Sequence, residues 1–137
     1  MRICLITPTK ANSASGNRTT AIRWRNILQS LGNAVHVSNN YTDQPADVMI
    51  AMHAWRSAQS IQNFADKYPS KPLIVAITGT DAYRFIHSHP KETIQSLSLA
   101  TKLVGLHALI HNTVPQEYRH KVHVIYQSTE ITAKAPS

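Results

Sequence analysis

Apolar residues recur along the chain with two different periods, and the two periods divide it into strands and helices. Six short apolar runs have the length and composition of strands that are covered on both faces. They lie at residues 2–7, 34–38, 47–52, 73–78, 102–106 and 122–126. Three other segments repeat apolar residues every three or four positions, as amphipathic helices do. They cover residues 17–31, 58–68 and 90–100, and residues 113–118 are expected to form one further helical turn.

Strands that alternate with helices along a chain usually pair in parallel through right-handed crossovers. The sequence therefore predicts an α/β fold, a Rossmann-like doubly wound parallel sheet of about six strands with helices on both faces. We expect the strand order 3-2-1-4-5-6. Residues 1–128 are interpreted as one domain, which suits a chain of 137 residues. Residues 129–137 are small and polar without periodicity, and we interpret them as a linker or tail.

The composition narrows the class of protein further. Hydrophobic residues make up 42% of the chain and charged residues 15%, which predicts a packed interior and excludes a disordered chain. No apolar run approaches the ~20 residues needed to cross a bilayer, so we expect no membrane partner. The apolar start of the chain is too short for a signal peptide, and the single cysteine, Cys4, cannot form an internal disulfide. We therefore expect a cytoplasmic protein.

Basic residues outnumber acidic ones, 14 to 7, and they are concentrated at the start of the chain. Five of them precede the first acidic residue, Asp43: Arg2, Lys10, Arg18, Arg23 and Arg25. A positive field attracts anions, whether phosphates, nucleotides, nucleic acid or acidic lipid. A solvated basic face that only aids solubility accounts for the same charge equally well. Nucleic acid is not an expected partner, because Trp24 falls in the apolar stripe of a helix and the basic residues do not alternate with exposed aromatic ones.

The first predicted strand is followed by a loop suited to an anion. In an open parallel sheet, ligands bind beyond the carboxyl ends of the strands. Ser15, Gly16 and Asn17 lead into a helix whose first N–H groups and positive dipole end favour negative charge. Lys10 and Arg18 add positive charge there. The alternative is ordinary capping of the helix by Ser15 or Asn17, with Arg18 in solvent.

Two further loops carry polar residues at the same predicted edge of the sheet. His53 and Arg56 follow the third strand, where the guanidinium could hold a phosphate through two hydrogen bonds or lie in solvent. Gly79, Thr80 and Asp81 follow the fourth strand. The carboxylate of Asp81 could accept hydrogen bonds from sugar hydroxyls, act as a base, or cap the turn.

Cofactor and metal motifs are missing from these loops. Only Gly16 is available where the dinucleotide-binding fingerprint needs three glycines, and no Gly-Lys-Ser/Thr triplet forms a phosphate loop. We therefore expect neither NAD nor ATP in its usual binding mode, and no cofactor in this domain. His87 and His89, like His107 and His111, are not joined by the cysteines or carboxylates that would complete a metal site.

Several stretches at the loops and strand ends form a further pattern. They are residues 2–8, 16–19, 23–24, 53–54, 56–58, 78–81 and 124–128, together with Ala51 and Tyr83. In this combination the sequence resembles the N-terminal half of a GT-B glycosyltransferase, and more narrowly the selenosugar synthases of selenoneine biosynthesis. The stretches at 16–18 and 78–81 are fairly specific in combination, and the resemblance extends to Ser128.

The resemblance implies a function for the domain. Such enzymes have two Rossmann-like domains, of which the N-terminal one commonly holds the acceptor and the C-terminal one the nucleotide sugar. The partners implied are a small anionic acceptor resembling selenophosphate and, as co-substrate of the whole enzyme, a UDP-sugar; the product is a selenosugar. On the matched loops we infer an acceptor or anion site formed by Ser15, Gly16, Asn17, Arg18, His53, Arg56, Gly79 and Thr80. Asp81 is the candidate catalytic base.

One departure from the family pattern concerns length. Members of the family are about twice as long, and the sequence lacks the donor-binding C-terminal domain. We therefore expect no sugar transfer by this chain alone and interpret the residues after 128 as the start of an interdomain linker. The alternative is a stand-alone, non-enzymatic Rossmann-like module that binds an anion or a partner.

Overall fold

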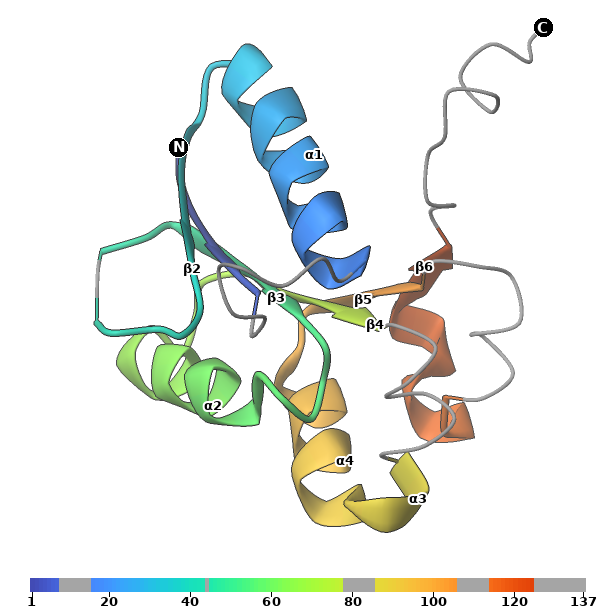
Figure 1. The fold of residues 1–137 in the computed structure, drawn as a ribbon. Helices are drawn as coiled ribbons and strands as arrows, with labels where there is room; N and C mark the ends of the chain where they lie inside the picture. The colour runs from blue at the N-terminus through green and yellow to red at the C-terminus, as the bar shows by residue number, and fades with distance from the viewer. Residues whose placement is uncertain (8–15, 44, 78–85, 106–113, 125–137) are drawn as a thin grey trace, which may run out of the picture.

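A computed structural model describes residues 1–7, 16–43, 45–77, 86–105 and 114–124, with the backbone alone at residues 16–19 and 86 (Figure 1). Six strands are present: β1 (Arg2–Ile6), β2 (Ala34–Ser38), β3 (Val48–Met52), β4 (Leu73–Ile77), β5 (Lys102–Gly105) and β6 (Val122–Val124). The helices are α1 (Gly16–Ser30), α2 (Ala58–Lys67), α3 (Ile86–Ser88), α4 (Pro90–Leu99) and the 3₁₀ helix η2 (Gln116–Lys121).

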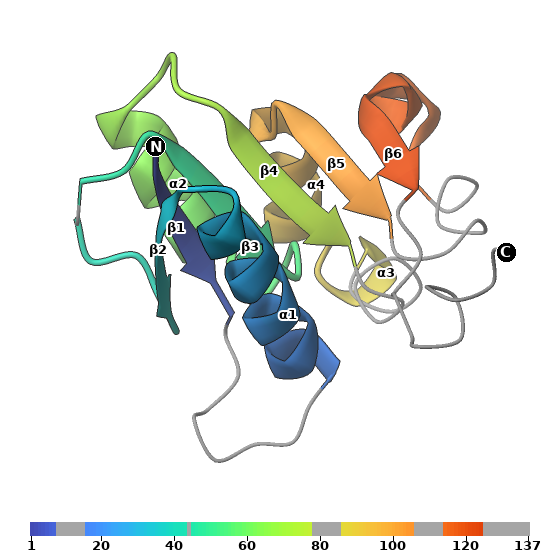
Figure 2. The same cartoon turned by 90° about the horizontal axis from the view of Figure 1, so that it is seen from above.

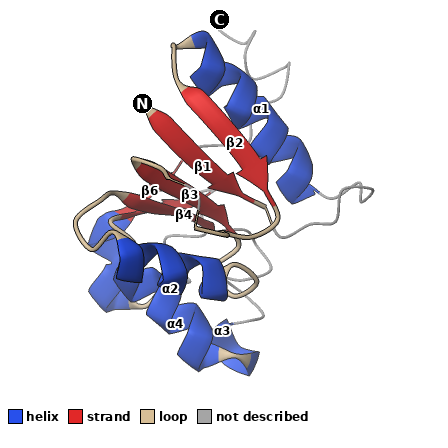
Figure 3. Ribbon diagram, turned by 90° about the vertical axis from the view of Figure 1, so that its left-hand side faces the viewer, coloured by secondary structure: helices blue, strands red, loops and turns tan. Residues whose placement is uncertain are grey.

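The strands form one sheet in which every neighbouring pair is parallel. Helix α1 covers one face, and α2 and α4 cover the other (Figures 1 and 3). The predicted α/β class, a Rossmann-like doubly wound sheet with helices on both faces, is confirmed. The helices predicted at 17–31, 58–68 and 90–100 are present within one residue at each end, whereas the turn expected at 113–118 is a 3₁₀ helix that starts later.

The predicted strand order 3-2-1-4-5-6 is wrong, because the observed order is β2-β1-β3-β4-β5-β6. Strand β3 lies between β1 and β4 and leaves β2 at the edge. The burial of the two strands explains the difference. All five residues of β3 are buried, whereas every residue of β2 is exposed or half-buried. A strand as apolar as β3 gains most from an interior place, and the more polar β2 tolerates an edge.

Alternate residues of the strands pack on opposite faces of the sheet. Leu5 belongs to the cluster beneath α1, which also contains Ile3, Ala21, Val48 and Ile50. Ile6, the next residue, belongs to the larger cluster that contains Phe64 of α2 and Leu97 of α4. The sheet therefore lies between two separate apolar layers, and these determine the face on which each strand side chain packs.

Two helix ends, one on each face of the sheet, are closed by identifiable residues. Gly32, just after α1, has φ +97°, the left-handed conformation expected of a glycine at a helix end. At the end of α4, the Nζ of Lys121 donates hydrogen bonds to the carbonyls of Leu97, Ser98 and Ala100 at 3.1, 3.1 and 2.8 Å. Lys121 therefore connects η2 and the start of β6 to the end of α4.

No helix in the described parts of the chain has the length and apolar character to span a membrane.

Candidate functional site

The carboxyl ends of β1 and β3 form the switch point of the sheet. From β1 the chain first adds β2 on one side and then β3 on the other. The two strands are adjacent, with Ile6 opposite Ala51. Ligands of open α/β sheets bind in the crevice beyond such a pair of strand ends. Figure 2 shows the first turn of α1 at this same edge of the sheet.

The corrected strand order changes which loops matter most. In the predicted order the crevice would lie between the first and fourth strands, beside Gly79 and Asp81. In the observed order it lies between β1 and β3, so the residues that flank it are Thr7 and His53.

His53 begins the turn that joins β3 to α2, and its backbone is strained. Its φ is +77°, a conformation that residues with a side chain rarely adopt, and only 2% of its surface is exposed. Its N–H donates to the carbonyl of Ala76 in β4 at 2.9 Å, and its carbonyl accepts from the N–H of Ser57 at 3.0 Å. Strain of this kind persists only where the surrounding structure holds it, and it is often found at functional sites.

Side chains complete the support of this turn. The Nδ1 of His53 accepts a hydrogen bond from the N–H of Arg56 at 3.1 Å. The hydroxyl of Ser57 donates to the carbonyl of Met52 at 2.5 Å. From α4, the hydroxyl of Ser96 donates to the carbonyl of Ala54 at 2.6 Å. The turn from His53 to Ser57 is thus attached to the sheet, to α2 and to α4.

The environment of His53 keeps its imidazole neutral. Burial, and secondarily the positive charge of Arg56, lowers the pKa of His53 from 6.5 to about 4. At neutral pH the ring therefore carries one proton. Because Nδ1 accepts the Arg56 N–H, that proton sits on Nε2. His53 thus offers a hydrogen-bond donor without a positive charge, and charge at the crevice comes from elsewhere.

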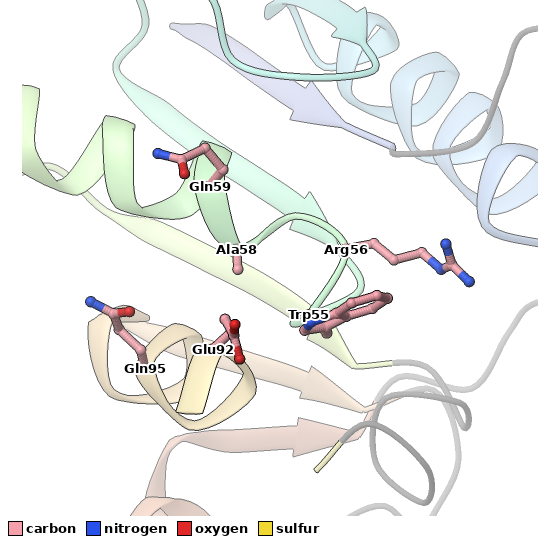
Figure 4. Close-up of a pocket in the computed structure, with 6 residues that line it drawn as sticks. All are labelled: Trp55, Arg56, Ala58, Gln59, Glu92 and Gln95. Carbon is pink, nitrogen blue, oxygen red and sulfur yellow. The ribbon is translucent and has the colours of Figure 1, made fainter. Parts of the chain in front are cut away.

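Trp55 and Arg56 stand at the exposed side of the same turn. The ring of Trp55 packs on His89, with the ring centres 4.3 Å apart, and the guanidinium carbon of Arg56 lies 5.5 Å from the centre of the indole. Figure 4 shows the Arg56 side chain extending away from α2 and α4, while Glu92 and Gln95 lie on the other side of Trp55. The Arg56 side chain is therefore exposed and extends from the turn that follows β3.

A groove of about 470 Å³ lies between α2 and α4 on the Glu92 side of Trp55. It is lined by Trp55, Arg56, Ala58, Gln59, Glu92 and Gln95. The lining includes the Glu92 carboxylate as well as Arg56, and the carboxylate repels an anion, so we do not include this groove in the anion site.

Thr7, the residue after β1, was not singled out from the sequence. It is fully buried, and its hydroxyl oxygen has no hydrogen-bond partner within the described part of the chain. The available signal was its position, since it is the polar residue that ends the first apolar run at a strand terminus where ligands bind.

The predicted site residues fall into three groups. His53 and Arg56 are brought together at the switch point. Gly16, Asn17 and Arg18 form the first turn of α1, of which the backbone is described. The remaining predicted site residues lie outside the described residues: Ser15, Gly79, Thr80 and Asp81. Lys10, His107, His111 and the predicted linker also lie outside them.

Elsewhere in the described segments, no group of three histidine, cysteine or acidic side chains is arranged to hold a metal. No protein-family model matches the chain, and no curated protein matches it either. Any functional statement therefore rests on the geometry of the crevice and on the motifs of the sequence.

Proposed function

We propose that this domain binds a small anionic acceptor at the β1/β3 crevice, as the acceptor-side half of a nucleotide-sugar-dependent glycosyltransferase. The acceptor class is a selenophosphate-like oxyanion, and the co-substrate is a UDP-sugar held by a second domain. The observation that carries the proposal is the strained His53 turn at the switch point of the sheet, from which the exposed Arg56 side chain extends (Figure 4).

The groups around the crevice suit an oxyanion. The guanidinium of Arg56 can donate two parallel hydrogen bonds to one oxyanion. The N-terminus of α1, a helix of 15 residues, adds the N–H groups of its first turn and the positive end of the helix dipole. His53 is neutral, so the charge of Arg56 and the uncharged donors around it would share the negative charge.

The proposed reaction places modest chemical demands on this domain. In the transfer, selenium forms a bond to the anomeric carbon of the sugar, and the bond from that carbon to UDP breaks, with UDP leaving as the anion. A selenophosphate is already ionised at neutral pH and needs no base to become a nucleophile. The acceptor domain would therefore serve to hold and orient the anion. A base at Asp81 stays a prediction from the sequence.

Binding of inorganic phosphate, measured by isothermal titration calorimetry, tests the anion site. We expect Arg56→Ala to weaken binding by about tenfold or more, the effect of removing one charged hydrogen-bonding partner. Arg25→Ala is the matched control, because it removes the same charge at a site away from the strand ends. Arg25 lies about 13 Å along α1 from the first residue of the helix, and its guanidinium donates hydrogen bonds to the side chain of Asn26. Equal losses in both variants would mean that the protein binds phosphate through its net charge alone.

Sugar transfer is tested with the native protein purified from its own cells. Incubation with a panel of UDP-sugars and selenophosphate should release UDP together with a selenium-bearing sugar. Phosphate binding without UDP release from any sugar nucleotide, in a native protein of about 15.3 kDa, would instead establish a stand-alone anion-binding module.

A further inference from the structure

The hydroxyl of Thr7 lies in a position where it contributes nothing to the stability of the folded protein. The residue has no exposed surface, and its Oγ1 finds no partner among the described residues. A buried hydroxyl without a partner has lost its hydrogen bonds to water and destabilises the folded state. Few such groups occur in native structures, and each needs a specific explanation. Valine, which has the same shape, would fill the position without that cost.

The direction of the Thr7 side chain follows from the sheet. Its N–H donates to the carbonyl of Ser38 in β2 at 2.9 Å, so the β1 pleat continues through Thr7. Leu5 packs beneath α1, and Ile6 packs on the opposite face. By alternation Thr7 shares the α1 face with Leu5. The hydroxyl therefore lies at the carboxyl end of β1, on the side of the sheet from which the first turn of α1 approaches (Figure 2).

We propose that the Thr7 hydroxyl is a ligand-binding group of the β1/β3 crevice and donates a hydrogen bond to one oxygen of a phosphate-class oxyanion. This inference rests on the proposed anion site and adds its innermost contact. The N–H groups at the start of α1 and the Thr7 hydroxyl would then donate hydrogen bonds to the same tetrahedral group. Because Thr7 is uncharged, it discriminates by shape and hydrogen bonding, whereas Arg56 attracts any anion.

The ligand must reach a hydroxyl that is enclosed in the unliganded protein. Small side-chain and backbone adjustments commonly accompany binding. A displacement by about the width of one oxygen atom is enough for a direct hydrogen bond, whose length is about 2.7 Å between heavy atoms. The cost of the unpaired hydroxyl is removed on binding, which adds to affinity for a ligand that supplies the missing acceptor.

Three variants test the inference by thermal unfolding and by calorimetric titration with inorganic phosphate. Thr7→Val should raise Tm by about 3 °C or more and weaken phosphate binding by about tenfold or more. Thr7→Ser keeps the hydroxyl and should retain binding within a few-fold of the unmodified protein. Tyr41→Phe is the matched control, because the buried Tyr41 hydroxyl also has no partner in the described structure but lies in the cluster with Phe64. It should raise Tm and leave binding unchanged.

The outcomes separate this inference from the function on which it rests. A lower Tm for Thr7→Val with unchanged phosphate binding overturns the inference, because the hydroxyl then has a structural partner. Binding that is lost in Arg56→Ala but unchanged in Thr7→Val leaves the anion site standing and removes Thr7 from it. A protein that binds no phosphate before any substitution overturns both proposals together.

Discussion

Acidification should destabilise this protein through His53, and the structure gives the size of the effect. The unfolded chain takes up a proton on this imidazole near its ordinary pKa of 6.5, whereas the folded protein takes it up only near pH 4. Between these values the unfolded state binds more protons, so protonation favours unfolding. The contribution of His53 is fully present above pH 6.5 and is lost as the pH falls toward 4. The loss at pH 4 amounts to about 3 kcal/mol.

The comparison that isolates this effect is the wild-type protein against His53→Asn. Asparagine tolerates a positive φ better than most residues, and its side-chain oxygen can accept the Arg56 N–H in place of Nδ1. The variant therefore keeps the turn but has no group that titrates at position 53. All other ionisable residues are the same in both proteins, so their contributions cancel in the difference.

The assay is urea unfolding at pH 7, 6, 5 and 4 for both proteins. The wild type should lose about 3 kcal/mol more unfolding free energy than His53→Asn between pH 7 and pH 4, with most of that loss below pH 6. Stability curves that run parallel across this range would refute the reasoning, because His53 would then be protonated as easily in the folded protein as in the unfolded chain.

Two further predictions concern residues away from the crevice. Lys121→Met should lower the unfolding free energy by about 1–3 kcal/mol in urea titrations, because three carbonyls at the end of α4 lose their charged donor while the apolar stem is kept. Unchanged stability would mean that water replaces the ammonium. Cys4 is buried in β1, and burial raises the pKa of its thiol from 9.0 to about 11. The native protein should therefore react with a thiol reagent at pH 8 only at the rate at which it unfolds, and rapid labelling in the absence of denaturant would contradict this burial.

Much of the fold could be predicted because most of its strands are largely apolar. Runs such as residues 73–78 have no polar face, and only a sheet covered on both sides buries them. The order of the strands was less accessible, since apolar runs show how deeply a strand is buried but not which strand lies beside it. The relevant signal was in β2, where His36 and Ser38 stand among the valines and are compatible with an edge. A prediction that Val48–Met52 lies in the interior of the sheet would have required comparing the apolar character of this strand with that of residues 34–38.

The candidate site could be predicted only in part. His53 and Arg56 were identifiable because they follow a strand of a parallel sheet. The positive φ of His53 and its hydrogen bond to Ala76 depend on the packing of β3 against β4, which local sequence does not determine. The support from Ser96 comes from a helix more than forty residues away in sequence. The sequence shows Thr7 at the end of the first apolar run, but not its burial or the lack of a hydrogen-bond partner for its hydroxyl among the described residues.

The attachment of the β3–α2 connection also determines how the protein opens. The amides of His53, Arg56 and Ser57 all donate to internal acceptors, and the anchor points belong to the sheet and to α4. The His53 amide opens only when its hydrogen bond to Ala76 of β4 breaks, so it should exchange with solvent as slowly as the amides of the central strands. A loop of this kind arrives at its ligand already ordered, and little binding energy is spent on fixing the Arg56 side of the crevice.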